Sequence, residues 1–409
     1  MGITGARVAM VSMHTSPVAR AGSRDSGGMN VVLLALAGEL AARGVEVDLL
    51  TRAEGEPAVS VVAPGVTLHE IRAGAPGPIP KAALSAVSDE FGEAVAHLGR
   101  SGDGFDVIHS HYWLSGIATL PVSLELGIPL VQSFHTIGAM KNRTLAPGQD
   151  AESELRLRSE MFLAGQASAI IAGSAAEATS LIDDLRAPAE KVWLIPPGVD
   201  AGLFSGSVQE AARTRASLRI PQGVPIIAVA GRIQPLKDQG LAIRVLAELH
   251  GPEFAGSVPP VLVIAGDSTP GEADYLDGLV RLAGDLGVAG SVRFVGALTR
   301  SELAGLFAAA SATLVPSHSE TFGLVALESA SSGTPVVGSS STGLRESIAD
   351  GLSGTLLDSR EPREWAAATD RILSGAMSAT ARLHAEDYTW SATAAATLAV
   401  YASVGHIRV

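Results

Sequence analysis

Short apolar segments alternate with longer amphipathic stretches along most of the chain. In the first half, this pattern predicts strands at residues 8–13, 45–51, 107–109, 130–134, 169–172 and 192–195. A long loop and a helix from about residue 29 to residue 43 follow the first of these strands. Continuous apolar strands separated by helices are typical of a parallel sheet that is covered on both faces.

The same alternation starts again after the turn cluster at residues 196–200, which ends the first predicted domain. The second series predicts strands at 226–230, 261–265, 292–295, 312–315 and 335–337. Helices are predicted at 238–249, 301–309, 322–332 and, as a last element, 390–403. We therefore predict an α/β protein of two doubly wound, Rossmann-like domains that face each other across a cleft. Ligands bind beyond the carboxyl ends of strands in such sheets, so residues that directly follow strands should line the cleft.

Composition narrows the kind of protein that these domains can form. The 409 residues carry 29 Lys and Arg against 42 Asp and Glu, a net charge of −13, and 47% of them are hydrophobic. Such an acidic chain is poorly suited to bind nucleic acid or an anionic membrane, because phosphate contacts need clustered cations. The absence of cysteine excludes disulfides and thiolate sites. No apolar run reaches the ~18 residues of a membrane span and no signal peptide precedes the first strand, so we expect a soluble cytoplasmic protein.

Two cations follow the first strand of the second domain. Arg232 comes just after strand 226–230, and Lys237 lies five residues further along the same loop. A guanidinium can bind two phosphate oxygens at once, and an ammonium adds a compact positive charge. The pair predicts a diphosphate site, although an ordinary surface loop with scattered charges would give the same pattern.

Two carboxylates follow strand 312–315. Glu320 is predicted in the loop, and Glu328, eight residues later, near the second turn of the next helix. Gly323 lets the backbone approach a ligand closely, and the amides that open the helix favour an anion. The carboxylates would accept hydrogen bonds from sugar or ribose hydroxyls; the alternative is that the helix dipole alone favours them. The loop 339–344 after the next strand could add further amides.

Candidate residues in the first domain also follow strands or open helices. Gly27 and Gly28 form a glycine-rich turn before a helix, but the G-x-G-x-x-G dinucleotide motif does not occur there. His135 and Thr136 come just after strand 130–134. The His135 imidazole could bind a sugar hydroxyl or steady charge at the reacting carbon, or it could be a core histidine bonded to the backbone.

His109 and His111 should share one face at a strand end, because side chains alternate along a strand. Tyr112 and Trp113 would line the same cleft. Zinc at this pair is conceivable, but without a nearby cysteine or an H-E-x-x-H motif we expect no metal. Three further basic residues could hold an anionic acceptor if the fold brings them together: Lys81, Arg156 and Arg158.

Several motifs together resemble one enzyme family. They are SETFGLVALE at residues 319–328, SMHTSP at 12–17, DSGGMN at 25–30 and HSHYWLSG at 109–116. The first resembles the motif shared by the retaining glycosyltransferases of family 4, which have the GT-B fold, and the resemblance covers essentially the whole chain. The other three closely resemble the family members of mycothiol biosynthesis, which transfer N-acetylglucosamine from UDP to an inositol phosphate.

Carried over residue by residue, the resemblance implies a role for each matching position. Residues 1–199 with the C-terminal helix 389–409 would bind the acceptor, and residues 200–388 would bind the donor. The catalytic set would be His135, Arg232, Lys237 and Glu320. The donor would contact Gly28, Arg232, Lys237, Glu320, Thr321, Phe322, Gly323, Leu324 and Glu328. The acceptor, a small anion, would contact Asn30, Lys81, Tyr112, Thr136 and Arg156.

The resemblance also implies the partners of the protein. A nucleotide-diphosphate sugar and a small-molecule acceptor would be its substrates. No cofactor would be required for the chemistry, magnesium would be optional, and a homodimer is compatible with the family. Nucleic acid and membranes would not be partners.

Two departures from the family pattern leave the substrates open. Residues 342–345 read Thr-Gly-Leu-Arg, followed by Glu346, where family members commonly have Gly-Gly-Leu-Pro, and Val32 stands where mycothiol enzymes often carry Tyr. The chain could therefore be a relative in specialised metabolism that glycosylates the thiol ergothioneine from a GDP-sugar in lincosamide antibiotic biosynthesis. A non-catalytic nucleotide-sugar or solute-binding protein, and a GT-B epimerase that hydrolyses the donor, are alternatives of other kinds.

Overall fold

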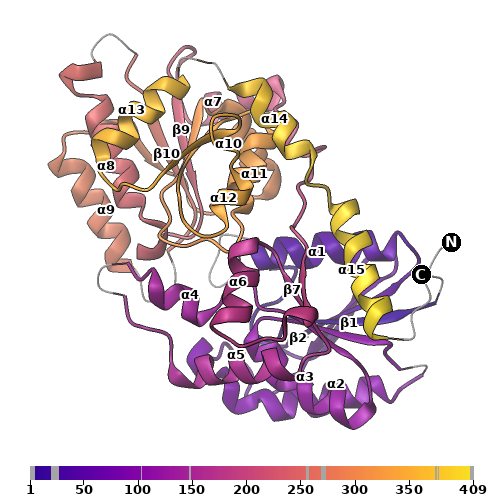
Figure 1. Ribbon diagram of the computed structural model, residues 1–409. Helices are drawn as coiled ribbons and strands as arrows, with labels where there is room; N and C mark the ends of the chain where they lie inside the picture. The colour runs from indigo at the N-terminus through magenta and orange to yellow at the C-terminus, as the bar shows by residue number, and fades with distance from the viewer. Residues whose placement is uncertain are drawn as a thin grey trace.

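Two open β-sheets covered by helices form two lobes of the protein (Figure 1). The computed structural model describes residues 5–19, 27–102, 104–146, 149–254, 258–268, 273–373, 375 and 377–405. None of the helices within these ranges is both long enough and apolar enough to cross a lipid bilayer.

The first sheet has the strand order β3-β4-β2-β1-β5-β6-β7-β8. Its strands are β1 (Arg7–Val11), β2 (Glu46–Arg52), β3 (Ala58–Ala63), β4 (Val66–Ile71), β5 (Val107–His111), β6 (Leu130–Ser133), β7 (Ala169–Ala172) and β8 (Val192–Leu194). All neighbours pair in parallel except β3 and β4. The sheet is therefore parallel, as predicted, except at this edge, where β3 and β4 form a hairpin that was not predicted. Only Pro64 and Gly65 connect β3 to β4, and so short a connection can join antiparallel strands only.

The second sheet is parallel throughout, with the order β11-β10-β9-β12-β13-β14. Its strands are β9 (Ile226–Ala230), β10 (Val261–Ala265), β11 (Val292–Phe294), β12 (Ala312–Val315), β13 (Val336–Ser339) and β14 (Gly354–Leu357). Strand order reverses between β9 and β12, as it does between β1 and β5 in the first sheet. A crevice opens at such a point in doubly wound sheets, because the following helices turn to opposite faces. The predicted fold class is confirmed.

Helices cover both faces of each sheet. Around the first sheet they are α1 (Gly28–Ala41), η1 (Lys81–Val87), α2 (Ser88–Gly99), α3 (Trp113–Leu126), α4 (Gly138–Arg143), α5 (Glu154–Gln166), α6 (Ala175–Asp183) and η2 (Ala189–Lys191). The second group is α7 (Val208–Ser217), η3 (Pro235–Lys237), α8 (Gln239–Leu249), η4 (Pro252–Phe254), α9 (Ala273–Asp285), η5 (Ala289–Ser291), α10 (Arg300–Ala309), α11 (Leu324–Ser331), α12 (Leu344–Ser347), α13 (Pro362–Leu373) and α14 (Ser378–Glu386). The helix predicted at 322–332 begins two residues later, because Gly323 takes a left-handed conformation, φ 98°, at its N-cap.

The last helix, α15 (Trp390–Val404), returns to the first lobe and packs against α1 (Figure 1). The Tyr401 hydroxyl of this helix lies 2.7 Å from Nδ1 of His109 in the middle of β5. The chain therefore crosses between the lobes twice, near residues 198 and 389. The two crossing segments touch, since Val199 N–H donates to the carbonyl of Tyr388 over 3.0 Å.

Gly198 allows this close crossing. A Cβ atom at this position would lie 2.2 Å from the backbone nitrogen of Trp390, where no side chain can give way. We expect Gly198→Ala to lower the free energy of unfolding by about 1–3 kcal/mol, as overpacking does in other proteins. Urea unfolding followed by circular dichroism measures the change. Gly165→Ala is the matched control, because its Cβ would meet nothing within 4 Å and it lies in helix α5, so it should stabilise the protein by up to about 1 kcal/mol. Equal stability of Gly198→Ala and wild type would contradict this account of the crossing.

Candidate active site

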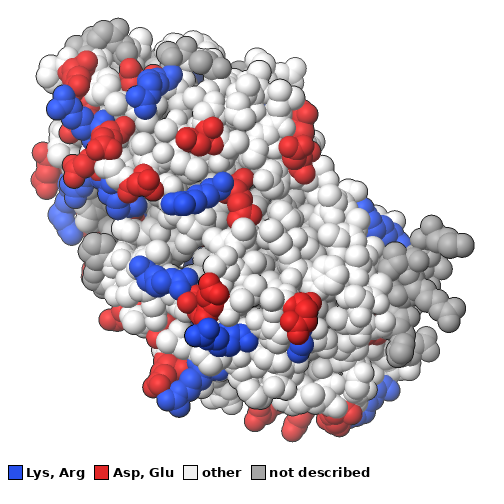
Figure 2. Space-filling view, in the orientation of Figure 1, with Lys and Arg blue, Asp and Glu red and all other residues white. Residues whose placement is uncertain are grey.

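A cavity of about 320 Å³ lies between the lobes at the carboxyl ends of the strands. Loops that follow β1, β5, β6 and β7 line it on one side, and loops that follow β9, β10, β11 and β12 line it on the other. Most of the predicted site residues are among its lining: Gly28, Lys81, Tyr112, His135, Thr136, Arg232, Lys237, Glu320, Thr321, Phe322, Gly323, Leu324 and Glu328. On the face drawn in Figure 2, positive and negative side chains of the described residues are interspersed rather than gathered by sign.

The loops after β9 and β12 meet through an ion pair. Lys237 Nζ lies 2.5 Å from Glu320 Oε1, which also accepts a hydrogen bond from the Ser317 hydroxyl over 2.7 Å. Because β9 and β12 are neighbours in the sheet, residues 83 positions apart in the sequence come together here. Arg232, from the same loop as Lys237, lines the cavity as well. This side of the cavity thus holds two cations and a carboxylate.

The second carboxylate, Glu328, is held by a residue that the sequence analysis missed. Glu328 is 2% exposed, and its Oε1 lies 2.6 Å from Arg300 Nη1 at the start of α10. Burial raises the pKa of Glu328 and Arg300 opposes that rise. The Arg300 guanidinium in turn stacks over the Phe204 ring, 4.7 Å from its centroid. Arg300 follows strand β11 by a few residues, so the rule that cleft residues follow strands could have identified it.

The motif around Gly323 joins the two lobes. A Cβ at Gly323 would lie 2.6 Å from Leu344 Cδ2 and 2.7 Å from Ser347 Oγ, so only glycine fits the turn that starts α11. The Thr321 hydroxyl, two residues earlier, donates a hydrogen bond to the carbonyl of His135 in the other lobe. The motif at residues 319–328 and the loop after β6 are therefore in direct contact.

His135 ends a row of three histidine rings. His135 has φ 60°, and its Nε2 lies 2.8 Å from Nδ1 of His111, whose ring is 4.1 Å from that of His109. The prediction that His109 and His111 share a face is confirmed. Burial lowers the pKa of His135 to about 4 and that of His109 to about 3. These imidazoles are therefore neutral near pH 7 and act as hydrogen-bonding groups rather than as cations. The described residues contain no group of three or more His, Asp or Glu placed to hold a metal ion.

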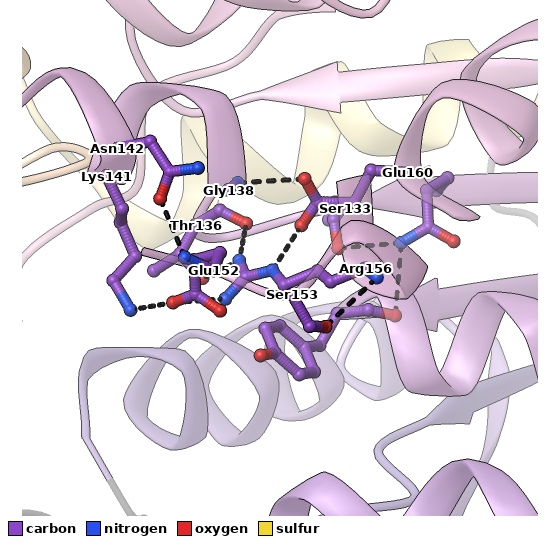
Figure 3. Close-up of polar contacts among 11 residues, drawn as sticks. Ser133, Thr136, Gly138, Lys141, Asn142, Glu152, Ser153, Arg156 and Glu160 are labelled. Carbon is purple, nitrogen blue, oxygen red and sulfur yellow. Dashed lines mark hydrogen bonds and ion pairs between the residues drawn. The ribbon is translucent and has the colours of Figure 1, made fainter. Parts of the chain in front are cut away.

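Tyr112 lies between two cations on the other side of the cavity. Lys81 Nζ is 4.4 Å and Arg156 Cζ 5.0 Å from the centroid of its ring. Arg156 does not line the cavity and is 3% exposed. It lies behind Thr136, to whose carbonyl and hydroxyl it donates over 2.9 and 3.0 Å (Figure 3).

Two carboxylates neutralise Arg156. Its Nε donates to Glu160 over 2.6 Å, and Nη1 lies 3.0 Å from Glu152 (Figure 3). Glu160 also accepts the amide of Gly138 at the start of α4, over 2.8 Å. Arg156 therefore fixes the loop between β6 and α4, which carries Thr136, and its charge is largely balanced before any ligand binds.

Three further residues expected in the cleft, besides Arg156, are placed elsewhere. Asn30 is buried and caps α1: its side chain accepts Gly27 N–H over 3.2 Å and donates to the Ser16 carbonyl over 2.6 Å. Trp113 opens α3 and belongs to the core behind the sheet, so the expectation that it lines the cleft is wrong. Arg158 is exposed on α5 and pairs with Glu154, so it does not converge with Lys81. Asp25 and Ser26 of the DSGGMN motif lie outside the described residues.

Two other ionisable residues that line the cavity were not predicted. The ring of His14, just after β1, lies 4.4 Å from that of Tyr112. Burial, together with the charge of Lys81, holds the pKa of His14 well below its ordinary value. Glu177 in α6 is 2% exposed, accepts Gly173 N–H over 2.8 Å, and has its pKa raised to about 7 by burial. Both come within a few residues of a strand end, which is the signal that could have found them.

The sequence matches two family models that together span most of the chain. A model described as "Glycosyl transferase 4-like domain" matches residues 27–198, and one described as "Glycosyl transferases group 1" matches residues 210–388. The D-inositol 3-phosphate glycosyltransferase of Stackebrandtia nassauensis is 39% identical over 406 residues, which cover 97% of this chain and 91% of that protein. The protein of the same name from Frankia alni is 40% identical over 399 residues, 95% of this chain and 97% of that one.

Solved structures show the same fold over nearly the whole chain. Sucrose-phosphate synthase from Thermosynechococcus elongatus superposes with a TM-score of 0.86 at 28% identity, covering 98% of this chain and 99% of that chain. HepE of Anabaena, solved in complex with UDP-glucose, gives a TM-score of 0.76 at 21% identity, covering 98% of this chain and 100% of that chain.

The buried histidines predict a loss of stability in mild acid. The unfolded chain binds a proton at each histidine as pH falls through about 6.5, whereas folded His109 stays neutral until about pH 3. Its contribution is therefore complete above pH 6.5 and falls by about 2 kcal/mol between pH 6.5 and pH 5. Urea unfolding measures the free energy of unfolding at pH 6.5 and at pH 5. The fall between the two pH values should be smaller in His109→Gln than in wild type by about 2 kcal/mol. His97→Gln, at an exposed position of α2, is the control and should keep the wild-type difference. An unchanged pH dependence in His109→Gln would contradict a neutral buried imidazole.

Proposed function

Because the chain belongs to the glycosyltransferases of family 4, which have the GT-B fold, we propose that it transfers N-acetylglucosamine, with retention of configuration, from UDP to an inositol phosphate. The family membership is carried by relatives that are 38–40% identical over nearly the full chain. Members of this family are enzymes, which favours catalysis over a purely sugar-binding function.

The donor side of the proposal rests on the ion pair between Lys237 and Glu320. A diphosphate placed between Arg232 and Lys237 would take over the Lys237 ammonium, which leaves Glu320 free to accept sugar hydroxyls. Glu328, anchored by Arg300, would bind the ribose of the nucleotide. The two cations balance the diphosphate in this proposal, so magnesium is optional and no cofactor takes part. UDP is favoured as the carrier because HepE, a protein of the same fold, is solved with UDP-glucose.

The acceptor side rests on the cations around Tyr112. Lys81 lies over the Tyr112 ring and lines the cavity, as Thr136 does. The Lys81 ammonium and the Thr136 hydroxyl are groups that bind a phosphate. Arg156 would act from behind by fixing Thr136, and Asn30 by fixing the Gly27–Gly28 turn. An inositol phosphate is favoured because the relatives quoted above are named for D-inositol 3-phosphate.

The proposed reaction needs positioning and charge stabilisation rather than a nucleophile from the protein. The acceptor oxygen bonds to C1 of the sugar on the face from which the diphosphate leaves. The bond between C1 and the phosphate oxygen breaks, and that oxygen takes the acceptor's proton. Arg232 and Lys237 stabilise the departing charge, and neutral His135 binds a sugar hydroxyl near C1. Closure of the cleft excludes water that would hydrolyse the donor.

Product analysis tests the substrates directly. With UDP-N-acetylglucosamine and D-inositol 3-phosphate together, we expect UDP release and an α-linked product, whose anomeric configuration is read by NMR. Thermal shift with UDP-, GDP- and TDP-sugars, alone and with inositol phosphate or ergothioneine, ranks the alternatives. Stabilisation by a GDP-sugar with ergothioneine, and none by the UDP and inositol phosphate pair, would overturn the proposed substrates in favour of the antibiotic pathway. Equal nucleotide release without acceptor would indicate a donor-hydrolysing enzyme.

Removal of Lys237 tests the proposed diphosphate site. Lys237→Ala should lower kcat by on the order of 10²–10³, by analogy with the loss of one donor that stabilises a developing anion. Steady-state kinetics measure this against Arg213→Ala, which removes an exposed cation of the same lobe, on α7, that does not line the cavity. The control should keep wild-type turnover. If Lys237→Ala stays within twofold of wild type, the ammonium does not act on the leaving group.

A further inference from the structure

A second polar contact, besides that of Thr321 with His135, links the lobes beside the cavity. The Glu346 carboxylate, in α12 of the second lobe, accepts the backbone N–H of Ala175 over 2.5 Å. Ala175 is the first residue of α6 in the first lobe, and the amide of Ala176 also interacts with this carboxylate. The exposed amides of a helix N-terminus favour a negative charge, and here that charge comes from the opposite domain.

The loop that carries Glu346 is attached to the donor side of the cavity. Thr342, at its start, has φ 41° and exchanges two hydrogen bonds with Glu320: Thr342 Oγ1 accepts the Glu320 N–H over 2.9 Å and donates to its carbonyl. The carbonyl of Glu346 accepts a hydrogen bond over 3.0 Å from the Tyr388 hydroxyl, next to the segment that crosses between the lobes. Glu346 is thus connected to Glu320 through Thr342, and through Tyr388 to the segment that crosses between the lobes.

The helix that Glu346 binds is attached to the other side of the cavity. Glu177, two residues after Ala175, lines the cavity and accepts the amide of Gly173, which lines it too. Gly173 belongs to the turn between β7 and α6, and Glu177, in the first turn of α6, also interacts with the backbone of His135. The contact between Glu346 and α6 therefore connects the loop of residues 340–346 to the side of the cavity that Gly173, Glu177 and His135 line.

Glu346 is half-buried, so burial withdraws its carboxylate from water. The amides of α6 replace part of the lost hydration only while the lobes are together. When the lobes separate, both the carboxylate and the amides return to water. The contact is therefore specific to the closed arrangement and costs little to break, as a reversible closure requires.

We propose that Glu346 is a positioning residue that holds the cleft closed by binding the N-terminal amides of α6. Through Thr342, it thereby fixes the loop that carries Glu320 against the first lobe during transfer. The contact itself does not depend on which substrates bind. Only the kinetic part of its test rests on the function proposed above.

Hydrogen exchange tests the contact without any substrate. In Glu346→Ala, the amides of Ala175 and Ala176 should exchange at least tenfold faster than in wild type, as measured by mass spectrometry on peptides that cover residues 173–180. Glu346→Gln should lie between the two, because it keeps an acceptor oxygen and loses the charge. Glu248→Ala, which removes an exposed carboxylate of the same lobe on α8, should match wild type. Unchanged exchange in Glu346→Ala would overturn the proposal.

Ala175→Pro removes the other half of the contact. Proline has no N–H and is favoured at the first position of a helix, and Ser174 before it is already extended, with φ −148° and ψ 158°. The helix should therefore form normally, which circular dichroism checks. With UDP-N-acetylglucosamine and inositol phosphate, each single variant should lower kcat/KM about tenfold and raise the ratio of donor hydrolysis to transfer.

The double variant decides between closure and a merely structural effect. If Glu346 acts through the α6 amides, Glu346→Ala with Ala175→Pro should be no worse than either single variant. Losses that multiply would show independent effects and would sink the proposal. If wild type transfers nothing from this donor while exchange at residues 175 and 176 responds to Glu346→Ala, the substrate assignment fails and the closure contact stands.

Discussion

Parallel strands place all their carboxyl ends at one edge of a sheet, and in this protein two such edges face each other. The loops after β1, β5, β9 and β12 leave their sheets in opposite directions, so each lobe opens a crevice toward the other. The cavity is therefore built from residues far apart in sequence that share only their position after a strand. Lys237 and Glu320, whose side chains are 2.5 Å apart, meet for this reason alone.

Charge in the cleft is largely paired before a ligand arrives. Glu320 binds Lys237 and Glu328 binds Arg300, while behind the wall Arg156 is held by two carboxylates. Ion pairing offsets the free-energy cost of removing these charged groups from water. For an isolated charge, that cost would be uncompensated. The pairing also means that the anionic substrates of the proposed function would exchange ion-pair partners at these residues rather than fill an empty site. Such an exchange couples the ligand to both the cation it takes and the carboxylate it releases.

The strands and motifs that local sequence patterns determine were predicted from the sequence. Strands β7, β9, β10 and β12 were predicted to the residue, because continuous apolar runs bounded by polar residues define buried strands. The β3–β4 hairpin was missed because Val59 and Val61 are exposed although apolar, so no alternating pattern marks β3. Most of the lining residues between Glu320 and Glu328 were predicted because their motif is local.

Long-range contacts decided the rest of the site. Arg156 and Asn30 lie behind the residues that line the cavity. Nothing in their own sequence segments shows that their side chains would hydrogen-bond to Glu160 and to the Ser16 carbonyl. Glu346 was noticed only as a departure from a family pattern. Its partner is the backbone amide of Ala175, 171 positions away. Because every residue except proline has such an amide, the identity of Ala175 gives no sign of the contact.

Backbone strain gathers at the same loops. Six non-glycine residues among those described have positive φ, and four of them, Tyr112, His135, Asp238 and Thr342, stand in loops at the carboxyl ends of strands around the cleft. Each such conformation costs about 1–3 kcal/mol and persists only where surrounding contacts fix it. For His135 and Thr342, those contacts are the Thr321 hydroxyl and the Glu320 backbone, both in the loop that follows β12. The strained loops are thus held by two residues that would bind the donor in the proposed function. Separation of the lobes would remove the Thr321 contact of His135 but not the Glu320 contact of Thr342, because of these two contacts only the first joins the lobes.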